Sequence, residues 1–90
     1  MLEHGVKGMD VLVMGEVRHP REVKWRPGLT AYDAITGAGG ATTLANLRYT
    51  LVRRPCGDRL AVIELPWYAS VTALELMPGD DVIVRITPDP

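Results

Sequence analysis

A chain of 90 residues, of which 47% are hydrophobic and 23% charged, has room for one small domain and is too apolar to be disordered. Its single cysteine, Cys56, excludes an intrachain disulfide, a four-cysteine zinc site and an iron–sulfur cluster. The net charge of −1 argues against nucleic-acid binding, and no segment approaches the roughly 20 apolar residues of a membrane span.

The charged residues are unevenly distributed along the chain. Residues 18–26 and 48–59 are rich in arginine, whereas residues 60–90 carry five acidic side chains and one arginine. The planar guanidinium of arginine favours bidentate contacts with carboxylates and phosphates. Two interpretations follow: the basic and acidic stretches pair on the surface of one molecule, or they meet head to tail between copies that close into a ring.

The first predicted element is a β-strand over residues 10–17, where valines alternate with other residues. Gly15 lies inside this strand, which indicates a bulge or the close approach of another backbone. Arg18-His19-Pro20 ends the strand, and residues 21–26 alternate again. The pattern therefore predicts a β-hairpin.

A helix is predicted after the turn at Pro27-Gly28. Thr30 is a favourable N-cap residue, and Asp33 three residues later suits the positive end of the helix dipole. The helix is expected to end at Gly37 and the Gly39-Gly40 pair, because glycine adopts positive φ without a steric cost.

Three more strands are predicted in the second half of the chain, over residues 49–54, 59–65 and 81–86. The first two are separated by a turn predicted at residues 55–58, which begins with a proline. The segment 66–76 shows no regular period, apart from one helical turn expected near its start.

The order of elements predicts an α+β domain in which one main helix packs on a small mixed sheet. With the first and last strands adjacent and parallel, this arrangement is the β-grasp, or ubiquitin-like, fold. We expect the domain to span residues 10–86, with tails at residues 1–9 and 87–90.

Three short motifs follow one another along this predicted domain. They are Gly15-Glu16-Val17 with Pro20, the segment 29–35 that leads into Ala38-Gly39-Gly40, and Met77-Pro78-Gly79-Asp80 before the last strand. In this order and spacing the chain resembles the SLBB (soluble-ligand-binding β-grasp) domain of bacterial polysaccharide export proteins. Arg53 stands where that family has a strand arginine. The chain departs from the family at Pro20-Arg21, where Pro-Gly is usual.

Seven motif residues are expected to make the fold rather than to bind a ligand: Gly15, Pro20, Gly39, Gly40, Pro78, Gly79 and Asp80. Pro-Gly is typical of a type II turn, and the following aspartate is expected to accept hydrogen bonds from backbone amides beyond the turn. Glu16 is expected on the strand face opposite Val17, where its side chain would contact solvent or a partner.

No motif points to an enzyme, a cofactor or a bound metal. His4 and His19 lack the spacing of metal ligands, and no nucleophile elbow surrounds Ser70. The glycines at residues 37–40 follow a helix instead of joining a strand to a helix, which excludes a dinucleotide-binding loop. Cys56, in a predicted exposed turn, is expected to be an unreactive thiol, with a reactive thiol or an intermolecular bridge as the alternatives.

The candidate ligand site combines aromatic and arginine side chains. Trp67 and Tyr68 follow a proline in an irregular segment, where an aromatic pair can stack on the apolar face of a sugar ring. Arg53 and Arg54 are predicted to bind a uronic acid or phosphate substituent. The alternative is that Trp67 closes one end of a core that contains no phenylalanine. Trp25 is expected at a contact surface on an edge strand.

The resemblance implies a non-catalytic module of polysaccharide export that binds carbohydrate or another soluble ligand, or that oligomerises. The alternatives are a structural ring-forming domain without a small ligand and an adaptor that binds a protein partner along its sheet edge. Expected partners are a polysaccharide, a second copy or an export protein. The family implies a periplasmic or outer-membrane-associated location. The chain as written has no signal peptide, which predicts a cytoplasmic location unless it is part of a longer protein.

Overall fold

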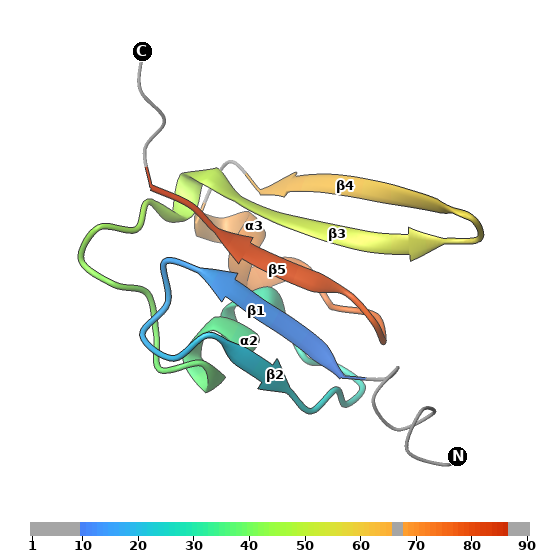
Figure 1. The fold of residues 1–90 in the computed structure, drawn as a ribbon, viewed down its shortest axis with the longest axis horizontal. Helices are drawn as coiled ribbons and strands as arrows, with labels where there is room; N and C mark the ends of the chain where they lie inside the picture. The colour runs from blue at the N-terminus through green and yellow to red at the C-terminus, as the bar shows by residue number, and fades with distance from the viewer. Residues whose placement is uncertain (1–9, 66–67, 87–90) are drawn as a thin grey trace.

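A computed structural model describes residues 10–65 and 68–86. In this part of the chain, two helices lie on one side of a five-stranded sheet with the strand order β2-β1-β5-β3-β4 (Figure 1). The elements are β1 Val11–Gly15, β2 Arg21–Val23, α2 Ala31–Gly37, the 3₁₀ turn η1 Leu47–Tyr49, β3 Thr50–Cys56, β4 Arg59–Leu65, α3 Tyr68–Ala73 and β5 Asp81–Val84.

The first and last of the described strands are neighbours in the middle of the sheet. β1 pairs with β5 in parallel, whereas the pairs β1–β2, β3–β5 and β3–β4 are antiparallel. A small mixed sheet with a helix packed on it is the α+β fold of the β-grasp type that the order of elements predicts.

The β3–β4 hairpin extends beyond the rest of the sheet (Figure 1). β3 pairs with β5 only from Leu51 to Arg53, but with β4 from Thr50 to Cys56. The strand therefore continues through Pro55, where the sequence pattern wrongly predicted the start of the turn. Proline is tolerated at this position because Pro55 lies beyond Asp81, the residue at which β5 begins, so the missing N–H removes no bond to β5.

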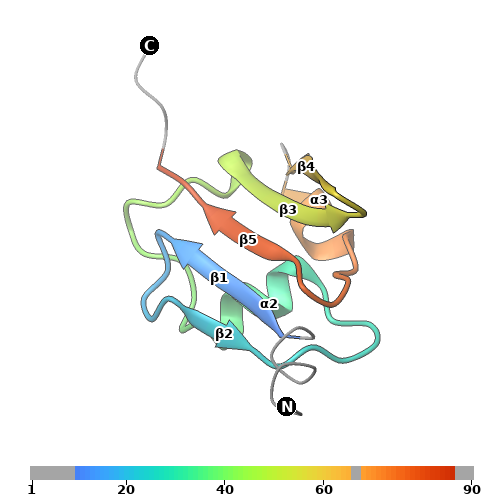
Figure 2. The ribbon, with the colours of Figure 1, turned by 45° about the vertical axis from the view of Figure 1, so that its right-hand side comes forward.

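The core lies between one face of the sheet and the two helices, which Figure 2 shows behind the strands. Alternate valines of the three central strands are buried: Val11, Val13, Val52, Val82 and Val84. The helices contribute a second buried layer: Ala31, Ala34, Ile35 and Val71. The described core is therefore built from aliphatic side chains, whose burial is the main stabilising contribution to a small domain.

A second helix, α3, forms where the sequence predicted only a single helical turn. It packs against α2 and buries Val71. The chain that leaves α3 then runs beside the start of α2, where the amide of Ala31 donates to the carbonyl oxygen of Leu74 at 3.0 Å. Tertiary packing of this kind stabilises short helices that local propensity alone does not.

A capping box begins helix α2. The hydroxyl of Thr30 accepts a hydrogen bond from the amide of Asp33 at 3.1 Å, and the amide of Thr30 donates to the carboxylate of Asp33 at 3.2 Å. We expect Thr30→Ala to lower the free energy of unfolding by about 1 kcal/mol, measured by urea denaturation. Thr36→Ala, at an exposed position of the same helix, should cost nothing. Equal losses in the two variants would show that the cap does not stabilise the helix.

Candidate functional site

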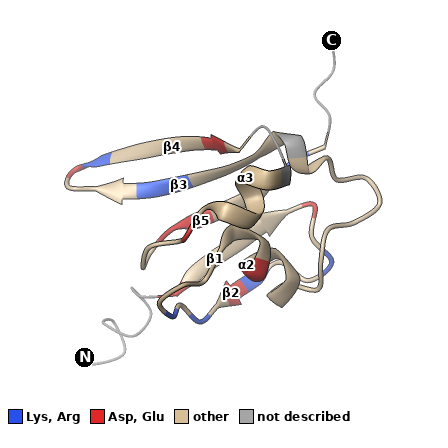
Figure 3. Ribbon diagram, turned by 180° about the vertical axis from the view of Figure 1, so that it is seen from behind, with Lys and Arg blue, Asp and Glu red and all other residues tan. Residues whose placement is uncertain are grey.

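One face of the sheet is not covered by any described segment. Both helices lie on the opposite side, as the views from the front and from behind show (Figures 1 and 3). Because side chains alternate along a strand, the strand register identifies the residues of this face. We call them the open face: Leu12, Met14, Glu22, Leu51, Arg53, Pro55, Leu60, Val62, Glu64, Asp81 and Ile83.

An apolar row crosses the open face from β1 to β3. Met14 faces Ile83, and Ile83 faces Leu51 on the neighbouring strand. These three side chains are half-buried, and Leu12 lies half-buried in the next row. Contiguous apolar side chains that no part of the fold covers are typical of an interaction surface.

Arg53 stands beside the apolar row and pairs with Asp81 on β5. Its Nη2 lies 3.2 Å from Oδ2 of Asp81, and the two side chains are 37% and 29% exposed. Nε of Arg53 is buried and has no hydrogen-bond partner. A pair this exposed contributes only about 0–1 kcal/mol to stability, so Asp81 orients Arg53 more than it stabilises the fold.

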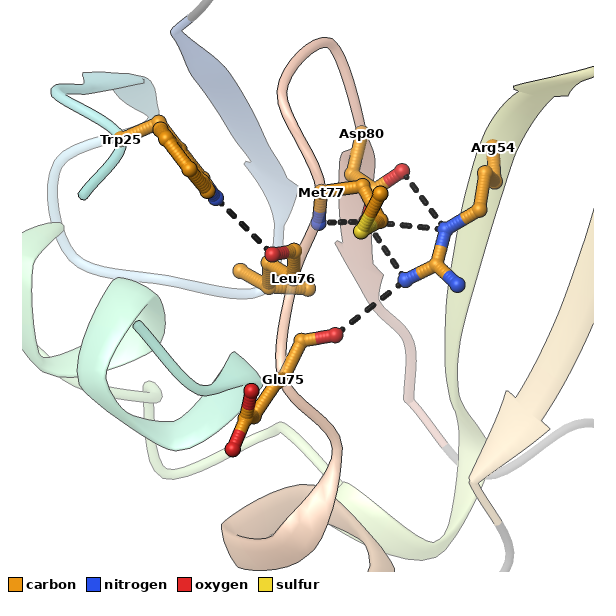
Figure 4. Close-up of polar contacts among 6 residues, drawn as sticks. All are labelled: Trp25, Arg54, Glu75, Leu76, Met77 and Asp80. Atoms are coloured by element: carbon orange, nitrogen blue, oxygen red, sulfur yellow. Dashed lines mark hydrogen bonds and ion pairs between the residues drawn. The ribbon is translucent and has the colours of Figure 1, made fainter. Parts of the chain in front are cut away.

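Arg54 points to the other side of β3 and makes a buried ion pair (Figure 4). Asp80 is fully buried and accepts hydrogen bonds from Arg54 Nη2 at 2.9 Å and from Arg54 Nε at 3.1 Å. Nη2 of Arg54 also donates to the carbonyl oxygen of Glu75 at 3.3 Å. The hydrogen bond to Asp80 raises the pKa of Arg54, an effect opposed by its burial. A raised pKa means that the guanidinium of Arg54 is charged at every pH below the ordinary arginine value.

A hydrogen bond between two of its own residues, Met77 and Asp80, holds the turn before β5. Oδ2 of Asp80 accepts a hydrogen bond from the amide of Met77 at 2.8 Å. This carboxylate therefore binds an amide before the turn and not, as the sequence indicated, beyond it.

Trp25 does not form an edge-strand surface, because β2 ends at Val23. Its ring packs against the core, and its Nε1 donates to the carbonyl oxygen of Leu76 at 2.8 Å (Figure 4).

The two arginines of the predicted ligand site do not lie on one surface, although they are adjacent in the sequence. Arg53 and Arg54 lie on opposite faces of β3, and the guanidinium of Arg54 is held by Asp80. Tyr68 is the first residue of α3, and Trp67 lies outside the described residues. Contact of these four side chains with a ligand stays a prediction.

A shallow pocket of about 380 Å³ lies where β1 and β5 end, and it is lined by Gly15, Glu16, Ile83, Val84, Arg85 and Ile86. Glu16 accepts a hydrogen bond from the hydroxyl of Thr42 at 2.8 Å, and Nε of Arg85 donates to the carbonyl oxygen of Tyr49 at 2.8 Å. Sequence reasoning missed Arg85. The predicted parallel pairing of the first and last strands could have indicated it. Parallel strands end at the same edge of a sheet, so Arg85 after β5 lies near Glu16 after β1.

The described residues contain no cluster of three histidine, cysteine, aspartate or glutamate side chains that can hold a metal ion. Cys56 is exposed at the end of β3. No helix in residues 10–65 or 68–86 is both long enough and apolar enough to cross a membrane.

Comparison with known protein families matches residues 9–84 to the SLBB domain, which is nearly all of the chain described above. The chain belongs to the SLBB domain family. The open face, the buried Arg54–Asp80 pair and the pocket are therefore features of this SLBB domain.

A related protein is the polysialic acid transport protein KpsD of Escherichia coli. It is 32% identical to the SLBB domain described here over 74 residues. The match covers 82% of this chain but only 12% of the relative's length. The similarity therefore concerns one part of a much longer transport protein.

Proposed function

We propose that this SLBB domain is a non-catalytic binding module of a polysaccharide-export protein and that its open face contacts an acidic polysaccharide. The observation that carries the proposal is the uncovered face of the sheet, on which Arg53 stands beside the apolar row. A periplasmic or outer-membrane-associated location, which the family resemblance implies, is part of the proposal.

The apolar row and Arg53 supply the contacts that the proposal assigns to a sugar polymer, beside the carboxylates of Glu64 and Asp81 on the same face. Met14, Leu51 and Ile83 offer an apolar surface for the C–H faces of sugar rings, and the half-exposed Arg53 offers N–H donors to a carboxylate. The pocket at the ends of β1 and β5 continues from Ile83 to a second arginine, Arg85. The similarity to part of a polysialic acid transport protein supports an acidic polymer as the ligand.

Titration of the isotope-labelled 90-residue chain with polysialic acid oligomers, followed by NMR, tests the proposal. We expect amide shifts in β1, β3 and β5, and no comparable shifts with neutral dextran. Arg53→Ala should weaken binding roughly tenfold, because one hydrogen bond to a charged group is lost. The matched control is Arg26→Ala, an exposed arginine outside the open face, which should leave the affinity unchanged.

Two results would contradict the proposal in different ways. Binding that survives Arg53→Ala combined with Trp67→Ala would exclude these residues as the site. Absence of shifts at millimolar concentrations of oligomer would exclude an acidic polysaccharide as the ligand. A structural role in assembly is then the remaining candidate, which is favoured by the position of β4 at one edge of the sheet.

A further inference from the structure

β4 is an edge strand that no other described segment pairs with. The sheet order places β4 at one edge and β2 at the other. β4 has seven residues and no proline, and two of its apolar side chains, Leu60 and Val62, are 53% and 57% exposed. A long edge strand with exposed apolar side chains is a template for pairing with another strand.

Pro55 identifies which backbone groups of β4 are at the free edge. Pro55 faces Leu60 and has no N–H, so these two residues do not exchange a pair of hydrogen bonds. Bonded and non-bonded pairs alternate along antiparallel strands, so Val62 and Glu64 are also in non-bonded pairs with β3. The N–H and C=O groups of Leu60, Val62 and Glu64 therefore point away from β3.

We propose that two copies of this domain pair through β4, antiparallel, about a two-fold axis at Val62. In this register Val62 faces Val62 of the second copy, and Leu60 faces Glu64 of the second copy. The three outward residues of each strand then make about six backbone hydrogen bonds across the seam. Isologous pairing of this kind needs one self-complementary strand and no second surface.

The charges of the hairpin favour this register over its neighbours. β4 carries a basic residue, Arg59, where it leaves the β3–β4 turn and an acidic residue, Glu64, near its other end. Figure 3 shows the two in blue and red. A register centred on Ala61 would bring Asp58 opposite Glu64, and one centred on Glu64 would place two glutamates face to face. A register centred on Ile63 would leave Leu60 beyond the end of the partner strand. Only pairing about Val62 uses all three outward residues without opposing like charges.

The other edge of the sheet is a poor template. β2 has only three residues and is directly preceded by Pro20, and short edges near proline resist pairing. Assembly through β4 therefore ends at two copies. Because the axis runs perpendicular to the sheet, both open faces lie on the same side of a continuous ten-stranded sheet, whose strand count is twice the five of one copy.

Cysteine cross-linking tests the pairing in the 90-residue chain, with Cys56→Ser as the background. Residues opposite one another in a bonded pair have Cα atoms about 5.5 Å apart, which a disulfide can span. Val62→Cys should therefore form a covalent dimer under mild oxidation. Leu60→Cys, also exposed on the same face, meets its own counterpart only about 14 Å away and should not cross-link. No dimer from Val62→Cys, or equal yields from both variants, would overturn the proposal.

Sedimentation velocity with lysine variants gives an independent test. Val62→Lys places two like charges opposite each other on the axis and should weaken the dimer about fivefold or more. Leu60→Lys, its control, places a lysine opposite Glu64 of the second copy and should keep or strengthen the dimer. A monomer at millimolar concentration, or equal weakening by both variants, would refute the pairing. Neither test contains a saccharide, so the dimer and the proposed ligand binding stand or fall separately.

Discussion

Gly15→Ala is expected to be the most damaging single methyl addition in this SLBB domain. Gly15 has φ of +90°, and a Cβ at this position would lie against the carbonyl oxygen of Val84, far inside contact distance. That oxygen accepts the amide of Glu16 at 2.8 Å, so the clash would separate β1 from β5. We expect the free energy of unfolding to fall by about 4 kcal/mol or more, a large part of the stability of a small domain.

Gly40→Ala is the matched control for this prediction. Gly40 has φ of +87°, close to that of Gly15, but an added Cβ meets no atom within 4 Å. The substitution should cost only the strain of a left-handed residue, about 1–2 kcal/mol. Thermal and urea denaturation of the two variants separate strain from clash. Equal losses would mean that the close approach of β1 and β5 does not constrain the fold.

Asp80→Ala is expected to have the second-largest effect. It removes the partner of Arg54 and also leaves the amide of Met77 without its acceptor. Because Asp80 is fully buried and the side chain of Arg54 is 27% exposed, the guanidinium cannot recover all of its hydration. Breaking a buried pair from one side should cost about 3 kcal/mol, measured by urea denaturation.

Asp81→Ala provides a control one residue away. Asp81 pairs with Arg53 on the exposed face, so its loss should cost less than about 1 kcal/mol. Asp80→Asn keeps the size of the side chain but turns an N–H donor group toward Arg54, and it should also destabilise the domain. If Asp80→Ala and Asp81→Ala proved equally mild, the buried pair would not be a stabilising contact.

Most elements of the fold could be predicted because their signals are local. The alternating valines identify β1, and Thr30 with Asp33 marks the start of α2. Helix α3 was underestimated because it is stabilised by burial of Val71, a contact that depends on where α2 lies. The continuation of β3 through Pro55 was missed because proline usually ends a strand. That β5 begins only at Asp81, opposite Arg53, is not visible in the sequence near Pro55.

The candidate site was harder to predict because it depends on long-range register. Arg53 and Arg54 are adjacent in sequence, which favoured a single site, but strand alternation sends them to opposite faces. Which aspartate each arginine meets follows from the pairing of Arg53 with Asp81 between β3 and β5. No local pattern encodes that pairing, so a ligand role and a structural role for Arg54 could not be separated beforehand.

The position of β5 also determines when the domain can fold. β5 is the last of the described strands, yet it lies between β1 and β3 and joins two antiparallel pairs that do not otherwise contact each other within the sheet. Isolated two-stranded hairpins are marginally stable in water. We therefore expect that the full sheet cannot form during synthesis until residues 81–84 have left the ribosome. We expect the domain then to fold cooperatively, at the slower rate typical of sheets whose paired strands are distant in sequence.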